Sequence, residues 1–582
     1  MIEFFVSPNG DDAAPGTEVA PFASLDRARR AVQHAPGSVV VHLRAGTYQL
    51  GETLRLTDRD AHGAAGSVVF QAYGYGTGQQ EPVTISGGRP ITDWEQRDGV
   101  WLADIGEEDT RELYVDGHRV ERAGIDGLAG TVASSATGYR TDNPEPLRWR
   151  APGSVEFVYR GIYPWTEARC AVSAVSAVAG DERTAVIEMR QPAFEWSMAL
   201  YNSAWEGATS TGPGLPSRVE NDPSFLVEPG TYALDRTRRG HHVLHYLPRV
   251  GEDPATTTVT LPRLETLISV DGARGLSFRG VTFAEATWCR PHSDRGFLHY
   301  HGSGYYDGGT VEKVVIVGGE SWVTVPGESE TMPAAVTVEG ASDVRFEGCR
   351  FTRFGASALG IRDASAVSVG GCDVDVVGGS AVQITGSRDV LVEDTVIRHI
   401  GLGYPGSPGL ALLDTEGCVV AHNRIEEVPH CGIAAGPGRG TRIERNLITG
   451  AMGVLADGGG IYISSRQGDS ALTGAQVAKN VVRDTRTPYN FALYADYGAC
   501  WVTFEENVVS EADNTAILQV DPPLENVTFR GNLWDADPLG LETIPASVTY
   551  EGNTTITDPV ALDAASAEIR KHAGPRRSAD PS

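Results

Sequence analysis

Phe346-Glu-Gly-Cys349 is the first of nine short segments that repeat along the C-terminal half of the chain. Each segment has an apolar residue, two polar or small residues, and then Asn, Cys or Thr. The intervals between successive segments are 23, 23, 28, 23, 34, 27, 25 and 21 residues. A period in the low twenties with one strand-like pattern per repeat is typical of a β-solenoid. The other eight segments are Val369-Gly-Gly-Cys372, Val392-Glu-Asp-Thr395, Val420-Ala-His-Asn423, Ile443-Glu-Arg-Asn446, Val477-Ala-Lys-Asn480, Phe504-Glu-Glu-Asn507, Phe529-Arg-Gly-Asn532 and Tyr550-Glu-Gly-Asn553.

A second apolar column follows the first, for example in Ala358-Leu-Gly-Ile361, Gly460-Ile-Tyr-Ile463 and Ala492-Leu-Tyr-Ala495. Two or more strands per coil favour a right-handed parallel β-helix over an antiparallel sandwich, which would not repeat one turn residue nine times. Equivalent positions of stacked coils lie about 4.8 Å apart. At that spacing the amides of successive Asn residues can hydrogen-bond along the stack.

The pattern divides the chain into four regions within an all-β fold. Residues 1–92 hold a capping helix, with Ser24 as its N-cap, and the first coils. Residues 93–262 are rich in Trp, Tyr and Arg and predict an inserted antiparallel, sandwich-like β domain. Residues 263–571 form the main β-helix, interrupted between Trp288 and Pro333 and closed by a C-terminal cap. Residues 572–582 are expected to be frayed.

Composition limits the classes of partner. The 582-residue chain has a formal net charge of -28, which argues against nucleic acid and anionic membranes as partners. Its seven cysteines are scattered without CxxC spacing, so neither a disulfide framework nor a zinc site is indicated. We therefore expect no cofactor. The N-terminus lacks the features of a signal peptide, which predicts a cytoplasmic protein unless a signal was removed. Whether the protein forms a homo-oligomer is left open.

The three longest coils, of 28, 34 and 27 residues, clearly exceed the minimal 21 to 23 residues. Their extra residues lie around Gly401–Leu410, between Asp457 and Gln476, and around Thr485–Phe491. Loops on one side of a solenoid can wall a groove, so we expect a functional groove there. Three acidic residues lie beside these loops: Asp414, Asp457 and Asp496.

Asp457 and Asp496 are the strongest candidates for catalysis. Two carboxylic acids are what glycosidic bond cleavage needs, because one protonates the leaving oxygen and the other attacks or activates water. Tyr462 and Tyr494 share one column and are expected to point outward, as a stacking surface for sugar rings. The alternative is that both acids are turn residues, since Asp next to Gly is ordinary turn chemistry.

One geometrical argument opposes this pair. With Ile461 and Leu493 in register, a fully extended chain would place the two acids about 23 Å apart, too far for joint catalysis. Either Gly458–Gly460 folds the chain back or the register differs. Asp521, one coil beyond Asp496, is the competing partner, although Asp521-Pro-Pro also reads as a turn. Asp414 is a third candidate.

Further side chains are assigned to substrate binding, each with a structural alternative. His430 is expected to bond a sugar hydroxyl or a backbone group. Arg466 is expected to bind an anionic substrate or to be solvated. Trp288 is a sugar platform or packs against the inserted domain. The histidines at 292, 299 and 301 lack the spacing of a known metal site, so no metal is assigned.

Several motifs resemble those of glycoside hydrolase family 141. They are Asp457-Gly-Gly-Gly-Ile-Tyr462, Leu493-Tyr-Ala-Asp-Tyr-Gly498, Val428-Pro-His-Cys-Gly-Ile433, Phe5-Val-Ser-Pro-Asn-Gly-Asp-Asp12 with Ala20-Pro-Phe22, and Pro248-Arg-Val-Gly-Glu-Asp-Pro254. The resemblance runs from Phe4 to about Pro575. It implies a right-handed β-helix with a β-sandwich-like insertion, and α-L-fucosidase or xylanase activity on complex plant polysaccharides. It also implies that Asp457 and Asp496 are the catalytic acids.

Two other classes of protein were weighed against a glycoside hydrolase. Polysaccharide lyases and uronate epimerases also use parallel β-helices, but they need a base for the C5 proton and cations at the uronate. The candidate stretches offer carboxylates and tyrosines with few cations, which favours hydrolysis. A non-catalytic carbohydrate-binding solenoid would have even coils and polar outer faces, and the uneven coils argue against it. The sequence therefore predicts a glycosidase acting on plant-type oligosaccharides or polysaccharides.

Overall fold

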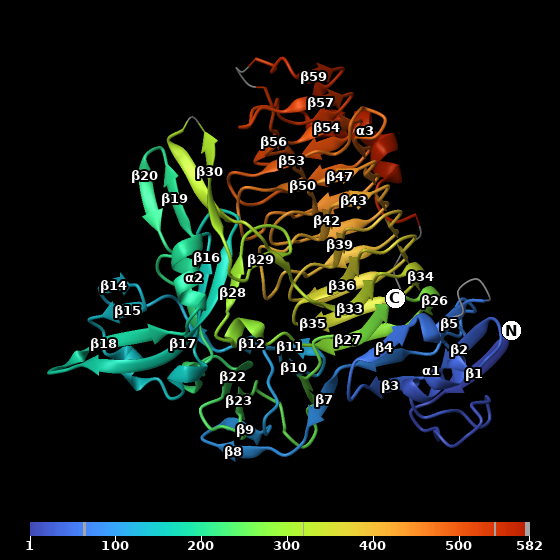
Figure 1. The fold of residues 1–582 in the computed structure, drawn as a ribbon, viewed down its shortest axis with the longest axis vertical. Helices are drawn as coiled ribbons and strands as arrows, with labels where there is room; N and C mark the ends of the chain where they lie inside the picture. Colours follow the sequence, from blue (N-terminus) through green and yellow to red (C-terminus); the bar gives the residue numbers. More distant parts are fainter. Residues whose placement is uncertain (62–65, 318, 540–542, 577–582) are drawn as a thin grey trace. The chain divides into compact units, whose positions relative to one another are not determined.

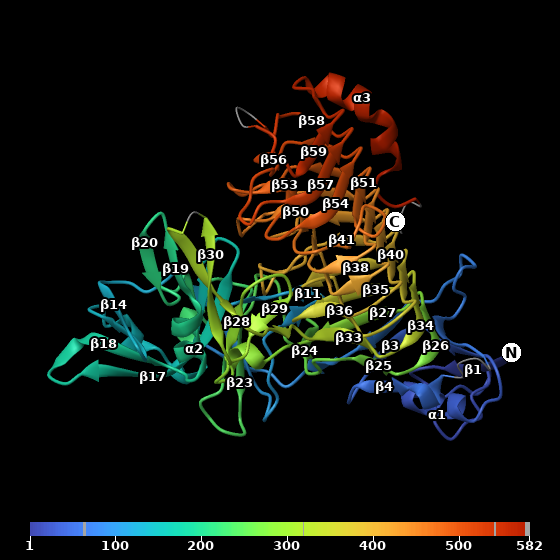
Figure 2. The ribbon, with the colours of Figure 1, turned by 45° about the horizontal axis from the view of Figure 1, so that its top comes forward.

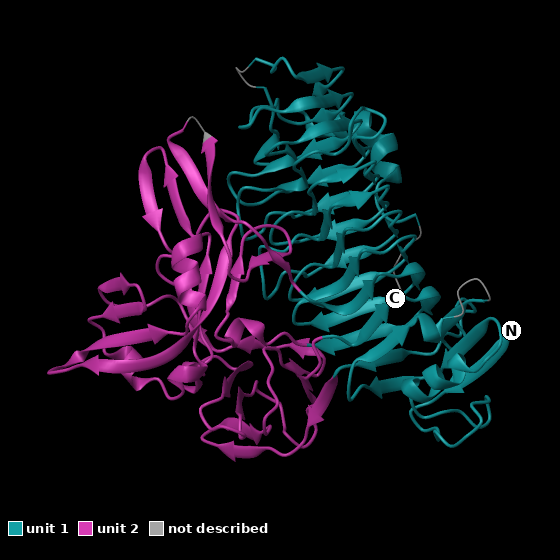
Figure 3. Cartoon of the chain, viewed as in Figure 1, with its two compact units in different colours: residues 1–87, 266–286, 333–582 teal, residues 88–265, 287–332 magenta. Residues whose placement is uncertain are grey.

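The chain folds into two compact units, which are coloured separately in Figure 3. The computed structural model describes residues 1–61, 66–317, 319–539 and 543–576. Unit 1 comprises residues 1–87, 266–286 and 333–582, and unit 2 comprises residues 88–265 and 287–332. The segment 287–332, which we expected to interrupt the main β-helix region, belongs to the inserted unit. Of the expected frayed tail, residues 577–582 lie outside the described part.

Unit 1 is a right-handed parallel β-helix, which confirms the predicted fold class (Figure 1). Its described residues form three parallel sheets of 13, 12 and 10 strands. The first sheet runs from β1 (Ile2–Val6) to β59 (Val548–Glu551), and the second from β3 (Gly46–Gln49) to β60 (Thr554–Thr555). The third sheet carries the candidate site; its strands are β4 (Leu54–Thr57), β25 (Ile268–Asp271), β33 (Ala334–Glu339), β36 (Ser357–Arg362), β39 (Val382–Thr385), β42 (Leu410–Leu413), β46 (Ile433–Ala435), β50 (Gly459–Ile463), β53 (Phe491–Ala495) and β56 (Asn514–Ala516).

A ladder of buried asparagines sets the register of the C-terminal coils at the turn between the first and second sheets. The amide Nδ2 of Asn480 donates to Oδ1 of Asn507 at 2.9 Å, and the backbone N–H of Asn480 donates to the same oxygen at 3.0 Å. The pattern repeats along Asn423, Asn446, Asn480, Asn507, Asn532 and Asn553. Each amide therefore satisfies backbone groups that a buried turn would otherwise leave unpaired.

Helices close the first coil and brace the last ones. Helix α1 (Leu25–Gln33) begins at the predicted N-cap, where the backbone N–H of Arg27 donates to Ser24 Oγ at 3.1 Å. Helix α3 (Pro559–His572) packs Leu562 against Val481 and Val508 on the outside of the second sheet. It therefore lies along the side of the coils instead of forming the end cap that we expected.

The segment after α3 is held in place. The backbone N–H of Gly574 donates to the carbonyl of Arg445 at 2.8 Å. Arg576 pairs with Asp394 at 2.6 Å. The described part of the tail, residues 573–576, thus follows earlier coils of the solenoid back from its C-terminal end, and the expected fraying does not begin at residue 572.

Unit 2 is built mainly from antiparallel strands, with β12 (Glu121–Arg122) and β22 (Thr231–Asp235) as a parallel pair, around an aromatic core. The long hairpin of β17 (Glu167–Val178) and β18 (Asp181–Met189) is its largest pairing, and it is labelled in Figure 2. Trp288 is 2% exposed, and its ring lies 5.4 Å from Phe297 and 5.8 Å from Tyr305. Trp288 is therefore a core residue of unit 2, and the sugar platform that we considered for it is wrong.

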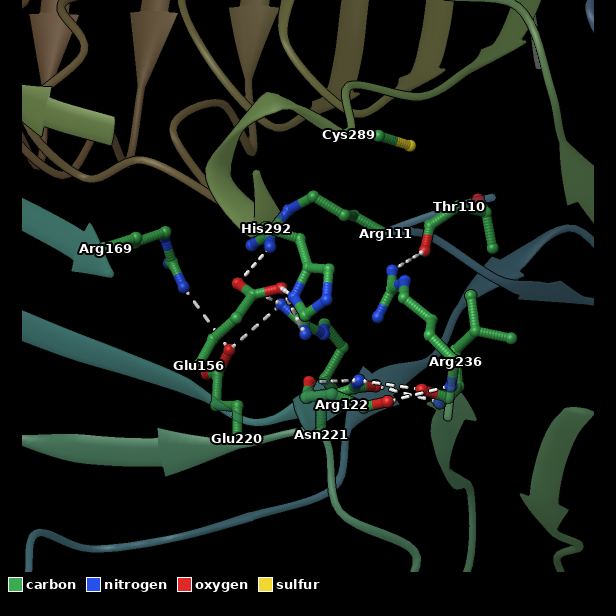
Figure 4. A network of polar contacts seen from close by, with 12 residues as sticks. Thr110, Arg111, Arg122, Glu156, Arg169, Glu220, Asn221, Arg236, Cys289 and His292 are labelled. Atoms are coloured by element: carbon green, nitrogen blue, oxygen red, sulfur yellow. Dashed lines mark hydrogen bonds and ion pairs between the residues drawn. The ribbon is translucent and has the colours of Figure 1, made fainter. Parts of the chain in front are cut away.

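Unit 2 also contains a buried ionic network (Figure 4). Glu156 is fully buried and accepts from Arg122 at 2.9 and 3.0 Å, as well as from Arg111. His292 Nδ1 lies 3.1 Å from the same carboxylate. Burial and the neighbouring Arg236 lower the pKa of His292 to about 3, so it stays neutral. The charges are paired internally, as buried ions require, and we assign the network a structural role.

Removing one rung of the ladder should destabilise unit 1. Asn480→Ala deletes the acceptor of the Asn446 amide and leaves buried donors unpaired. Each such group costs about 1–3 kcal/mol. We expect the free energy of unfolding to fall by about 3 kcal/mol or more, measured as a lower urea midpoint. Asn553→Ala, at the partly exposed end of the ladder, should cost clearly less. Equal losses for the two variants would contradict the ladder's role.

Candidate active site

The site is built on two neighbouring strands of the third sheet, β50 and β53. Ile461 pairs with Leu493 and Tyr462 pairs with Tyr494. Ile461 and Leu493 are completely buried in the solenoid core. Because side chains alternate along a strand, the two tyrosines project from the outer face, one coil apart.

Each tyrosine hydroxyl donates a hydrogen bond to one of the two candidate acids, and the two pairs cross. Tyr462 donates to Asp496 Oδ2 at 2.7 Å, and Tyr494 donates to Asp457 Oδ1 at 2.9 Å. The two rings meet edge to face, with centroids 5.1 Å apart. They are only 6% and 4% exposed. The tyrosines therefore position the acids, and the expected stacking surface for sugar rings is not available on them.

The chain folds back at Asp457, which answers the distance objection. The predicted register of Ile461 with Leu493 is present, but Asp457 has a left-handed φ of 55° and so turns the chain just before β50. Its N–H donates to the carbonyl of Tyr489 at 2.8 Å. The estimate of about 23 Å assumed an extended chain. The turn shortens this separation, and the two carboxyl groups lie near enough for the charge of Asp496 to act on Asp457.

The three glycines after Asp457 are required by packing. A Cβ on Gly458 would lie 2.8 Å from His430 Nε2 and 2.9 Å from Cys431 Sγ. A Cβ on Gly459 would lie 2.2 Å from the carbonyl oxygen of Phe491. The glycines thus allow the turn to press against adjacent coils. Packing against the adjacent coils is sufficient to explain them.

The environment of Asp457 favours its protonated form. Burial and the negative charge of Asp496 raise the pKa of Asp457 to about 7, against a smaller opposing effect of the Tyr494 hydrogen bond. Burial and the same two carboxylates also raise the pKa of the Tyr494 hydroxyl, so it remains a donor. The site therefore holds one carboxyl group that carries a proton near neutral pH, next to a second carboxylate that accepts from Tyr462.

His430 supports the turn from below. It is 2% exposed, and its Nε2 lies 3.3 Å from the carbonyl oxygen of Ala456, which requires a proton on Nε2. Ala456 directly precedes Asp457. Of the two roles considered for His430, the structure thus provides the backbone contact, while the contact with a sugar hydroxyl stays a prediction.

The remaining predicted residues do not converge on the acids. Asp414 is exposed at the end of β42, three coils before β53, which corresponds to about 14 Å along the solenoid. Asp521 is exposed at a turn beyond β56 and precedes a cis proline. Arg466 is exposed, and its guanidinium donates to the carbonyl of Gly468 at 3.4 Å. The partner that the structure gives to Asp496 is thus Asp457, through the two tyrosines.

The extra residues of the long coils lie at both edges of the third sheet, not at one. Residues 399–409 and 484–490 precede β42 and β53, whereas residues 464–474 follow β50. One exposed aromatic residue in these loops was not singled out from the sequence. Tyr489, in the loop before β53, is 56% exposed. The sequence feature that could have identified Tyr489 is its position in an over-long coil.

The described residues contain no group of three or more His, Cys, Asp or Glu side chains arranged to hold a metal ion. No helix in the described part of the chain has the length and apolar character needed to span a bilayer.

Comparison with known proteins supports the fold. A family model for the right-handed β-helix region matches residues 266–448 and 364–534. No curated protein matches the sequence. A solved structure described as a glycoside hydrolase superposes with a TM-score of 0.77 at 21% identity, over 100% of both chains. A complex of XylC with xylose gives a TM-score of 0.51 at 10% identity, over 95% of this chain and 86% of that one. At these identities the likeness establishes a shared fold.

Asp457→Asn should change how stability depends on pH. The folded protein keeps the Asp457 proton up to about pH 7, whereas the unfolded chain loses it near pH 4. Stability of the wild type therefore falls as pH rises through this window. Asn cannot ionise. The free energy of unfolding of Asp457→Asn, relative to that of the wild type, should therefore increase from pH 5 to pH 8 by more than about 1 kcal/mol.

Chemical unfolding at the two pH values measures this difference. Asp414→Asn is the matched control, because Asp414 is an exposed aspartate with a similar left-handed φ of 53°. Its stability difference from wild type should not depend on pH in this window. The same flat behaviour for Asp457→Asn would contradict the raised pKa.

Proposed function

We propose that this protein is a glycoside hydrolase in which Asp457 and Asp496 act as the two catalytic carboxyl groups. The observation that carries the proposal is the crossed pairing of two adjacent acids with two buried tyrosines. It places an acid with a raised pKa, Asp457, beside a second acid on a partly exposed surface. Pairs of titratable groups whose pKa values are pushed apart are how glycosidases divide acid and base roles.

Asp457 takes the role of general acid. It holds a proton up to about pH 7 and is itself partly exposed. In the reaction the Asp457 proton passes to the glycosidic oxygen as the bond from that oxygen to the anomeric carbon breaks. Tyr494 keeps the carboxyl group oriented through its hydrogen bond at 2.9 Å. A general acid with a pKa near the working pH is the most effective.

Asp496 takes the complementary role. Its carboxylate either attacks the anomeric carbon or removes a proton from the attacking water. Tyr462 donates to one of its oxygens at 2.7 Å. One carboxylate oxygen is therefore used for positioning while the other remains for chemistry.

A neutral sugar is the substrate class that this site favours. Two carboxyl groups and two tyrosine hydroxyls form the polar part of the site, and a uronate would add a third negative charge beside them. The motifs shared with glycoside hydrolase family 141 point to α-L-fucosides or xylan-type chains. The full-length superposition on a structure described as a glycoside hydrolase supports the same class. We infer a plant-type oligosaccharide or polysaccharide as the substrate.

Leaving-group dependence should separate the two roles. We expect the wild type to hydrolyse an aryl α-L-fucoside or β-xyloside. Asp457→Asn should lower kcat/KM by about 10²–10⁴-fold on a natural glycoside, because its alcohol leaving group needs a proton. It should lose far less on a 2,4-dinitrophenyl glycoside, whose leaving group needs none. Asp496→Asn should lose activity on both substrates.

Asp414→Asn serves as the control and should match wild type. Activity that survives in both Asp457→Asn and Asp496→Asn would contradict the proposal. So would the absence of hydrolysis on all glycosides together with release of an unsaturated, EDTA-sensitive product from a uronide polymer, which would indicate a lyase.

A further inference from the structure

Tyr489 is the exposed end of an aromatic chain that leads to the two acids. Its ring lies 5.8 Å from that of Phe491, which lies 4.7 Å from that of Tyr494. Tyr494 in turn meets Tyr462. The two inner tyrosines are buried, whereas Tyr489 is 56% exposed. Within this chain, Tyr489 is thus the ring with the most surface open to a ligand.

The backbone of Tyr489 is fixed on both sides. Its carbonyl accepts from the N–H of Asp457 at 2.8 Å, and its own N–H donates to Asp513 Oδ2 at 2.7 Å. Its φ of 60° lies in the left-handed region, which is unfavourable for an aromatic residue and is retained when surrounding contacts determine it. The ring is therefore presented from a fixed turn that is hydrogen-bonded to the turn of Asp457 in the preceding coil.

The charges of the two acids reach the Tyr489 hydroxyl. Burial, followed by the charges of Asp457 and Asp496, raises the pKa of Tyr489. The phenol thus lies in the field of both carboxylates.

An exposed aromatic ring beside two acids has a clear use in carbohydrate binding. One face of a neutral sugar ring presents C–H groups, and these pack against an aromatic face, while its hydroxyl groups stay available for polar partners. A rigid ring also gives up little conformational entropy on binding.

We propose that Tyr489 is the stacking platform of this site and holds a neutral sugar ring against the acid pair. This inference rests on the proposed function and assigns the sugar-binding surface of the same site. The platform contributes to binding in the ground state and in the transition state alike, so it acts on KM more than on kcat. It takes the place of Tyr462 and Tyr494, whose rings are buried.

Three substitutions of one side chain test the platform. With whichever glycoside the wild type hydrolyses, Tyr489→Ala should raise KM at least 10-fold with kcat changed less than about 3-fold. Tyr489→Phe keeps the aromatic face and should stay within about 2-fold of the wild-type KM. Tyr489→Leu keeps bulk without an aromatic face and should resemble Tyr489→Ala. Leu472→Ala, at a 97% exposed loop residue, controls for surface changes.

Other results would overturn the platform. A KM of Tyr489→Ala equal to that of the wild type would overturn the platform directly. A fall in kcat with unchanged KM, or a displaced pH profile, would show that Tyr489 only supports the turn of Asp457. A loss of binding in Tyr489→Phe equal to that in Tyr489→Ala would assign the effect to the hydroxyl group instead.

Binding without turnover separates this inference from the proposed function. Calorimetry with neutral xylo-oligosaccharides and fucosylated oligosaccharides measures affinity without turnover. A wild type that binds these sugars but hydrolyses none of them would overturn the catalytic proposal alone. Binding that weakens at least 10-fold in Tyr489→Ala but not in Tyr489→Phe would support the platform. A wild type that binds none of these sugars would overturn it.

Discussion

The pairing register between β50 and β53 is the constraint on which the site depends. Tyr462 on β50 lies opposite Tyr494 on β53. The hydroxyl group of Tyr462 donates to Asp496, which follows β53, and that of Tyr494 donates to Asp457, which precedes β50, so the two hydrogen bonds cross. A shift of β53 by one residue would turn Tyr494 into the core and Leu493 out of it. The apolar core and the acid pair are therefore fixed by the same alignment, so the stability of the solenoid and the geometry of the site are coupled.

That alignment is maintained from a distance by the asparagine ladder. The ladder lies at the turn between the first and second sheets, whereas the acids lie at the two ends of strands in the third sheet. Each buried amide bonds to the next coil and to the backbone, so a slip of one coil would break several buried hydrogen bonds at once. The outer face is then free to carry charged groups whose placement gives little stability. The raised pKa of Asp457 means that ionising this residue costs stability near neutral pH.

Much of the fold follows from local patterns in the sequence. The Asn column and the apolar column after it predict the stacked coils, because a parallel β-helix is the arrangement that stacks equivalent positions. The helix at Ser24 is predicted by its cap. Residues 287–332 could not be assigned to unit 2 in this way, since their partners are strands distant in sequence. The position of α3 depends on Leu562 meeting a row of apolar residues on the outside of the second sheet, and a single helical pattern does not show which surface it covers.

The candidate site was predictable in its residues but not in its geometry. The over-long coils beside them and the resemblance to family 141 motifs indicated Asp457 and Asp496. The left-handed backbone of Asp457 and the direction of the tyrosine rings are tertiary features, and an extended chain gave too large a separation. Tyr489 escaped notice because exposure, not residue type, sets it apart from the buried Tyr462 and Tyr494.

The most direct test of this account is the protonation state of Asp457 itself. Infrared difference spectra between wild type and Asp457→Asn, recorded across a pH series, report the carbonyl band of one protonated carboxyl group. The account predicts a band that disappears with an apparent pKa of about 7, and at higher pH in Tyr494→Phe, which lacks the hydrogen bond that lowers the pKa. A band that is already lost near pH 4, as for an ordinary aspartate, would contradict it.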